Sequence, residues 1–172
     1  MSKHSLLRLS AIAAIVGGAL RVADGLFVTS AAPQTQQLAY FFTDLMLLFG
    51  LCGIYFTRSH RLGLAGLLGF VISFLGILMV RSSAISIFGF SAYLVGASVM
   101  LFGMVAIGIA MLVNHAFPKL PPLLWLASLI IGLIGLLPAA MAWAVTLAGV
   151  TFGIGFITAG ISLLFPSPES IT

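Results

Sequence analysis

The chain has 172 residues, of which 62% are hydrophobic and only 6% are charged, and its mean hydropathy is +1.28. Ordinary soluble domains are about 45–50% apolar and about 25% charged, so the composition excludes an aqueous globular enzyme and a disordered chain. The net charge of +4 does not predict nucleic-acid binding, because the 7 Lys and Arg residues are scattered singly and form no basic stripe. The composition is that of an integral membrane protein.

Six stretches are long and apolar enough to be transmembrane helices, since a span needs about 20 mostly apolar residues to cross about 30 Å of hydrocarbon. In chain order they are residues 9–28, 38–56, 62–80, 88–113, 123–140 and 144–165. The segments between them are 30–34, 57–61, 81–83, 114–119 and a turn after Pro138. The sequence therefore predicts one all-α membrane domain over residues 1–165 and a short tail over 166–172.

The first stretch has a second interpretation as a cleavable signal peptide, because Lys3 and Arg8 precede its apolar residues. The charges of Arg21 and Asp24 interrupt the stretch, and Pro33 would follow the cut. A membrane-spanning helix is therefore the favoured interpretation.

The cations predict the orientation of the chain, because Lys and Arg accumulate in cytoplasmic loops. Five of them fall on the N-terminal side, namely Lys3, Arg8, Arg58, Arg61 and Lys119, and Arg81 alone lies at the opposite rim. We therefore expect a multi-pass protein of the plasma (cytoplasmic) membrane with both termini in the cytoplasm. Interfacial aromatic residues agree: Tyr55 and Trp125 are expected at the cytoplasmic interface, and Tyr40, Tyr93 and Trp143 at the outer one.

Weak self-similarity, at a spacing of roughly fifty residues, suggests three tandem antiparallel hairpins. A cation-leucine pair opens each odd span, and a Phe-Gly pair lies near the middle of each even span, at Phe49-Gly50, Phe102-Gly103 and Phe152-Gly153. Chance is the competing interpretation, because the chain contains 14 Phe and 19 Gly.

Small residues allow helices to approach closely in lipid, where little hydrophobic force drives packing. The glycines expected on helix faces are Gly63, Gly66, Gly69, Gly132, Gly135, Gly149 and Gly153. We expect them to pack within the bundle, and a face left over for a partner protein is the alternative.

Charged side chains inside the predicted spans are the strongest functional signal, because each central charge costs roughly 2.5–3.5 kcal/mol on insertion scales. Arg21 and Asp24 are three residues apart and share a helix face. A short loop should make the helix of Asp44 their antiparallel neighbour, at about the same depth.

Two interpretations of these charges remain open. The first is a structural salt bridge that pins the first hairpin. It leaves one carboxylate without a cation unless Arg81 reaches down from the outer rim. The second is an outward-facing pocket for a polar headgroup, a small solute or a proton, in which Arg21 contacts an anion and Asp44 exchanges a proton. The predicted ligand-binding residues are thus Arg21, Asp24, Asp44 and Arg81.

Other chemistry is weakly represented. Cys52 is the single cysteine, so the chain cannot form an internal disulfide or a thiolate metal site. His4, His60 and His115 are better explained as interfacial groups near anionic lipid than as zinc ligands. Single hydroxyls without a paired base are poor nucleophiles, and we expect no catalytic residue, metal or cofactor.

Three classes of function fit these features. The sequence favours a non-enzymatic accessory or scaffold protein that contacts membrane lipids and, through its glycine-rich faces, protein partners. The second class is a small transporter, channel, or lipid- or solute-binding protein with an outward-facing site at Arg21, Asp24 and Asp44. The third is an intramembrane enzyme whose two carboxylates protonate a lipid-like substrate. The residues alone do not decide between them.

Overall fold

The computed structural model describes residues 3–27, 33–81, 86–87, 90–135, 137 and 141–165. Within these residues the chain forms helices and one short antiparallel ribbon. The elements are α1 (Lys3–Phe27), α2 (Pro33–Arg81), β1 (Ser86–Ile87), β2 (Phe90–Ser91), α3 (Ala92–Val113), α4 (Leu120–Ile134) and α5 (Met141–Leu164). The predicted all-α class is confirmed for the body of the molecule. The predicted helix start at residue 88 is wrong, because Phe90–Ser91 form β2, which pairs with β1, and α3 begins only at Ala92. The predicted tail, 166–172, lies outside the described residues.

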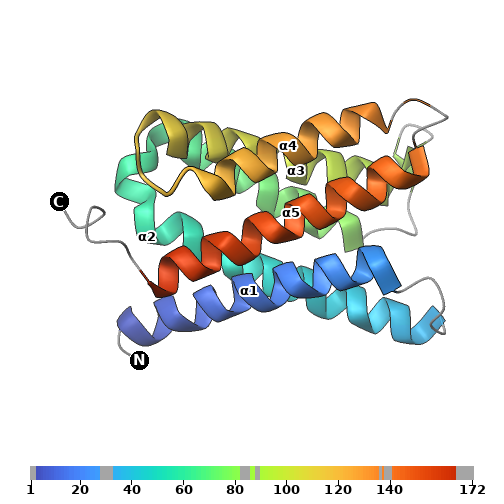
Figure 1. The fold of residues 1–172 in the computed structure, drawn as a ribbon, viewed down its shortest axis with the longest axis horizontal. Coiled ribbons are helices and arrows are strands. Elements are labelled where there is room, and N and C mark those ends of the chain that lie inside the picture. The colour runs from blue at the N-terminus through green and yellow to red at the C-terminus, as the bar shows by residue number, and fades with distance from the viewer. Residues whose placement is uncertain are drawn as a thin grey trace.

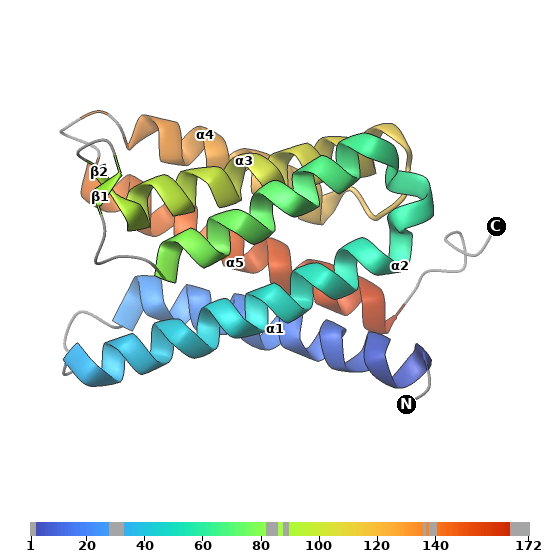
Figure 2. The same ribbon diagram turned by 180° about the vertical axis from the view of Figure 1, so that it is seen from behind.

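Helix α2 consists of two arms, residues 33–62 and 64–81, which meet at Gly63. Gly63 has φ 60° and ψ −160°, a conformation essentially restricted to glycine. From this bend the arms run back toward the same end of the molecule (Figure 2). Straight, 49 residues would extend over roughly 70 Å, so the bend is what keeps the molecule short.

The sequence predicted the turn at 57–61, and that prediction is wrong. None of those residues is Gly or Pro, and the Thr57 hydroxyl donates a hydrogen bond to the Gly53 carbonyl at 2.6 Å, as hydroxyls inside helices do. The helix therefore continues to the first residue that can take the bend. The prediction that Gly63 packs on a helix face is also wrong, because no neighbouring element of the described residues comes within 4 Å of the position its Cβ would take.

The helices form two layers. Figure 1 shows α1, α5 and α4 side by side in the front layer. Figure 2, from behind, shows the two arms of α2 with α3. Neighbours in contact are α1 with α2, α2 with α3, α3 with α4, α4 with α5, and α5 with α1. The described helices thus close into a ring.

The two ends of the bundle differ in what they hold. At one end, here called the proximal end, lie the start of α1, the bend of α2, the connection at 114–119 and the end of α5 (Figure 1). The distal end holds the end of α1, both ends of α2 and the start of α3. The five cations that were expected on one side of the membrane therefore belong to segments of the proximal end, while α2 ends at Arg81 on the distal end.

Glycines bring backbones into contact where helices cross. A Cβ at Gly18 of α1 would lie 2.5 Å from the Gly153 carbonyl oxygen of α5, and a Cβ at Gly153 would lie 2.6 Å from the Gly18 carbonyl oxygen. A Cβ at Gly69 of α2 would lie 2.8 Å from the Gly103 carbonyl oxygen of α3. These contacts agree with the expectation that the glycines pack inside the bundle. Gly132 is looser, since its nearest neighbour, Leu101 Cδ2, would be 3.7 Å from a Cβ.

Large apolar side chains cover both the inside and the outside of the molecule. The core contains Leu47, Leu51, Met104, Ile107, Trp125 and Phe156. The outer surface carries many exposed aliphatic and aromatic side chains, such as Leu64, Ile130 and Val113. Four described helices are long and apolar enough to cross a membrane: α1, α2, α3 and α5. Helix α4 has 15 residues and ends at Ile134, earlier than the predicted 140, so length and composition alone do not reach the predicted count of six spans.

Two of the aromatic residues assigned to the membrane interface are in the core instead. Trp125 is fully buried and packs against Phe156, with ring centroids 5.6 Å apart. Tyr55 is 7% exposed and stacks on Phe70 at 4.4 Å between centroids. The position of a residue in the sequence predicts its depth along a helix, but it does not tell which face of the helix turns inward. Tyr40, Tyr93 and Trp143 are exposed.

The Phe-Gly pairs do not occupy equivalent places. Phe49 and Phe102 are each 55% exposed, whereas Phe152 is 3% exposed and belongs to the core. Pairing of successive segments resembles three hairpins, but the three-hairpin sequence repeat stays a prediction.

Candidate ligand-binding cavity

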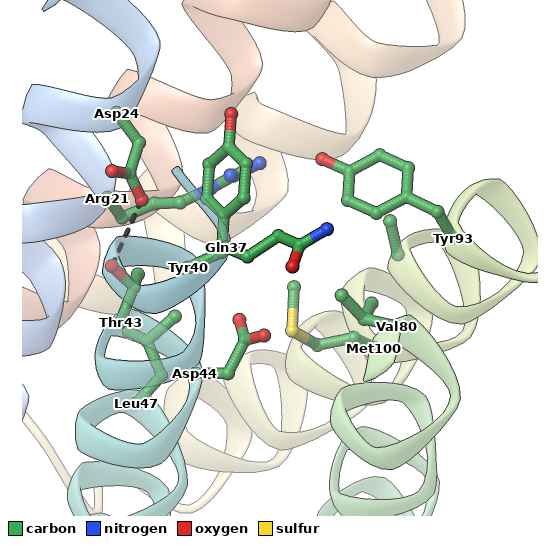
Figure 3. A pocket seen from close by; sticks show the side chains of 11 residues that line it. Arg21, Asp24, Gln37, Tyr40, Thr43, Asp44, Leu47, Val80, Tyr93 and Met100 are labelled. Carbon is green, nitrogen blue, oxygen red and sulfur yellow. Dashed lines mark hydrogen bonds between the residues drawn. The ribbon is translucent and has the colours of Figure 1, made fainter. Parts of the chain in front are cut away.

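A cavity of about 260 Å³ lies at the distal end, between α1, the two arms of α2 and α3. Its lining side chains are Arg21, Asp24, Gln37, Tyr40, Thr43, Asp44, Leu47, Val80, Tyr93, Ala97 and Met100. Figure 3 shows them converging from the four segments. Three of the four residues predicted to bind a ligand, Arg21, Asp24 and Asp44, therefore border one space.

Antiparallel packing of α1 on the first arm of α2 brings these charges together. A Cβ at Gly17 would lie 2.8 Å from the Leu47 backbone nitrogen, and one at Gly50 would lie 2.7 Å from Ala14 Cα. Residue numbers therefore rise along α1 in the direction in which they fall along the first arm of α2, as in an antiparallel pair. This register places the last turns of α1 beside the early turns of α2, as the short loop predicted.

Asp24 is held by a neighbour on α2. The Thr43 hydroxyl lies 3.0 Å from Asp24 Oδ2, to which it donates, and 2.9 Å from the carbonyl oxygen of Ala39 one turn back. Thr43 is 1% exposed, so this hydroxyl sits within the contact between the helices. The hydrogen bond fixes one oxygen of the Asp24 carboxylate at the wall of the cavity (Figure 3).

Arg21 is half-buried and reaches α5. A Cβ at Gly149 would lie 3.4 Å from Arg21 Nη2 and 3.6 Å from Arg21 Cζ. The absence of a side chain at Gly149 therefore leaves room for the guanidinium. Its charge interacts electrostatically with the Asp24 carboxylate, so Arg21 and Asp24 form one side of the cavity.

Asp44 enters the cavity from the first arm of α2. Its carboxylate points into the space beneath the Gln37 side chain and beside Met100 (Figure 3). Gln37, Tyr40, Asp44 and Leu47 recur at the three- and four-residue spacing of one helix face. All four line the cavity.

The carboxylates and the aromatic rings that line the cavity are suited to binding a cation. The described lining residues include two carboxylates, those of Asp24 and Asp44, and one guanidinium, that of Arg21. Tyr40 and Tyr93 line the cavity and are 38% and 42% exposed. Aromatic faces attract ammonium groups, and a carboxylate nearby adds direct charge attraction.

The remaining residues considered from the sequence are Arg81, the fourth predicted ligand-binding residue, and the histidines. The side chain of Arg81 lies outside what the structure describes, so its expected reach toward the cavity is not tested. The side chain of His4 is likewise outside. Among the described residues no group of three His, Cys, Asp or Glu side chains comes together as a metal site would require.

Sequence reasoning missed four polar or aromatic roles in this cavity. Tyr40 and Tyr93 were assigned only to the interface, and Gln37 and Thr43 were not singled out. The helical spacing from Asp44 would have found Gln37 and Tyr40. The contribution of Tyr93 depends on the packing of α3 against α2, for which the sequence carries no comparable signal.

Comparisons of the chain with protein-family models, with curated proteins and with solved structures give no match.

Proposed function

We propose that this chain is a small multi-pass membrane protein that binds a small organic cation in the distal cavity and serves as a solute-binding or transport protein. The observation that carries the proposal is the convergence of Arg21, Asp24 and Asp44 on one cavity of about 260 Å³. A volume just below the range of roughly 300–1,000 Å³ for ordinary ligand pockets suits a small solute or headgroup.

The roles of the charged residues follow from their neighbours. Asp24 is occupied by the Thr43 hydroxyl and by the charge of Arg21. Arg21 therefore serves as the counter-charge of Asp24, in place of the anion contact that the sequence suggested. The Asp44 carboxylate points into the cavity (Figure 3), and in this proposal it is the contact for a cationic ligand.

The membrane arrangement belongs to the same proposal. In this arrangement the two arms of α2 cross the membrane as separate spans. With α1, α3 and α5 they make five spans, and α4 with its flanking residues makes the sixth. The proximal end, which holds most of the cations, faces the cytoplasm by the positive-inside rule. The cavity then opens toward the outer side of the plasma membrane.

The test is a binding measurement on the full chain in phosphatidylcholine nanodiscs. The probes are ethylammonium, acetate and acetamide at equal ionic strength, which differ in charge at similar size. We expect saturable binding of ethylammonium alone. Asp44→Asn should weaken it by about tenfold or more, equivalent to about 1.4 kcal/mol, with an unchanged melting temperature.

Glu169→Gln is the matched control, because it removes the same charge from the C-terminal tail. It should bind ethylammonium as the native chain does. Failure of the native chain to bind ethylammonium, or an Asp44→Asn variant that binds normally, would contradict the proposal.

The accessory or scaffold role stays the second candidate. Its main support in the sequence was the glycine-rich faces, and Gly18, Gly69 and Gly153 are used for contacts within the chain. Acid catalysis on a lipid-like substrate would use the same two carboxylates. Recovery of a chemically altered ligand from the nanodiscs would favour that third class over binding or transport.

A further inference from the structure

A second, apolar hollow adjoins the cavity. It has a volume of about 110 Å³ and is lined by Phe41, Asp44, Leu45, Leu48, Ile77 and Leu78. These residues belong to the two arms of α2, so the hollow, here called the lateral groove, lies in the seam between the arms. Phe41 and Leu78 are each 48% exposed. The lateral groove therefore lies on the outer surface of the bundle.

Asp44 belongs to both spaces. On the first arm of α2, Tyr40, Asp44 and Leu47 line the cavity, while Phe41, Asp44 and Leu48 line the lateral groove. The two sets are adjacent stripes of one helix, and Asp44 is the position where they meet. On the second arm Val80 lines the cavity and Ile77 the groove, one turn closer to the bend.

The two arms of α2 both run back from Gly63 toward the distal end (Figure 2). Most of the polar side chains between them line the cavity, whereas the lateral groove is lined by apolar side chains apart from Asp44. The Asp44 carboxylate therefore lies at the boundary between a polar and an apolar space.

We propose that the ligand is a single-chain amphiphile with a cationic headgroup. Its ammonium group lies in the cavity between Asp44 and the tyrosines, and its alkyl chain leaves through the lateral groove into the lipid. The proposal rests on the proposed function and specifies its ligand class. The Asp44 carboxylate and the rings of Tyr40 and Tyr93, which line the cavity together, account for the headgroup. The apolar groove that begins at the same carboxylate accounts for the alkyl chain.

The alternative is a ligand that enters from water alone. A cavity of about 260 Å³ would then accept ethylammonium but exclude decylammonium, whose chain would have no path out. An open lateral path accepts both. Because the alkyl chain of the amphiphile is in hydrocarbon both before and after binding, the specificity of binding comes from the headgroup. The lateral groove provides the path by which the amphiphile enters from the lipid.

The experiment measures radiolabelled ethylammonium bound to the full chain in phosphatidylcholine nanodiscs, with decylammonium as competitor. Empty nanodiscs correct for partitioning. Decylammonium should displace ethylammonium from the native chain, and decanol, which has no charge, should not. In Leu78→Trp, which fills the lateral groove, competition by decylammonium should weaken by about tenfold or more while ethylammonium still binds.

Leu75→Trp is the matched control, because Leu75 lies on the same arm with 50% exposure and does not line the groove. Leu45→Trp fills the groove from the other arm and should repeat the result for Leu78→Trp. Retained ethylammonium binding shows that each variant is folded.

The outcomes separate the two proposals. If ethylammonium does not bind the native chain, the proposed function fails. If ethylammonium binds but decylammonium does not compete, or competes equally well in Leu78→Trp and Leu45→Trp, the amphiphile inference is overturned and the proposed function stands.

Discussion

Helix α1 contributes to two regions that differ in packing: its crossing with α5 and the distal cavity. At the crossing, Gly18 and Gly153 place backbone against backbone with no room for a methyl group. One turn further along α1, Arg21 and Asp24 face a cavity instead. The change from small to charged residues coincides with the change from contact to open space.

This difference explains how a chain with 6% charged residues can keep charges among its apolar helices. At the crossings the close approach of the backbones depends on glycines and involves no charged side chain. The charged side chains of Arg21, Asp24 and Asp44 line the cavity instead.

Gly153→Ala should have the largest effect on stability, because it breaks the crossing. Its Cβ would lie 2.6 Å from the Gly18 carbonyl oxygen, and overpacking of this kind costs about 1–3 kcal/mol. Gly132→Ala is the control, since its Cβ would come no closer than 3.7 Å to Leu101 and alanine favours a helix by up to about 1 kcal/mol. Thermal unfolding in mild detergent, followed by circular dichroism, measures both. Equal melting temperatures would show that the crossing tolerates a methyl group.

Thr43→Val should lower the stability of the protein less than Gly153→Ala does, and its structural effect should be confined to the cavity. It removes the hydrogen bond to Asp24 Oδ2 at nearly constant volume, at a cost of about 1 kcal/mol. Ethylammonium affinity should change as well, because the Asp24 carboxylate loses its fixed orientation. Thr43→Ser keeps the hydroxyl and should restore binding. A valine variant that binds and melts like the native chain would remove Thr43 from the site.

Trp125→Phe should have the smallest effect, and it tests the packed region. The indole Nε1 is buried and has no hydrogen-bond partner among the described residues. Phenylalanine removes that unsatisfied donor but leaves a small void, and the two effects offset to within about 1 kcal/mol. The same unfolding measurement applies. A loss of more than about 2 kcal/mol would mean that the indole nitrogen contributes a contact of its own.

Much of this arrangement could be predicted from residue order. Apolar length identified the helices, and the few charges identified Arg21, Asp24 and Asp44 as neighbours. The position of the α2 bend could not be predicted from polarity, because a cationic segment continues as helix until Gly63 permits a positive φ. The inward faces of Tyr55 and Trp125 were missed because a helix that is apolar all round gives no amphipathic signal for its buried side.

The torsion at Gly63 has a mechanical consequence. The second arm of α2, residues 64–81, is a lever about 27 Å long. A rotation of about 10° at its pivot therefore moves the far tip by about 5 Å. Val80, which lines the cavity, lies near that tip, so the position of this part of the cavity wall depends on the backbone torsion at Gly63.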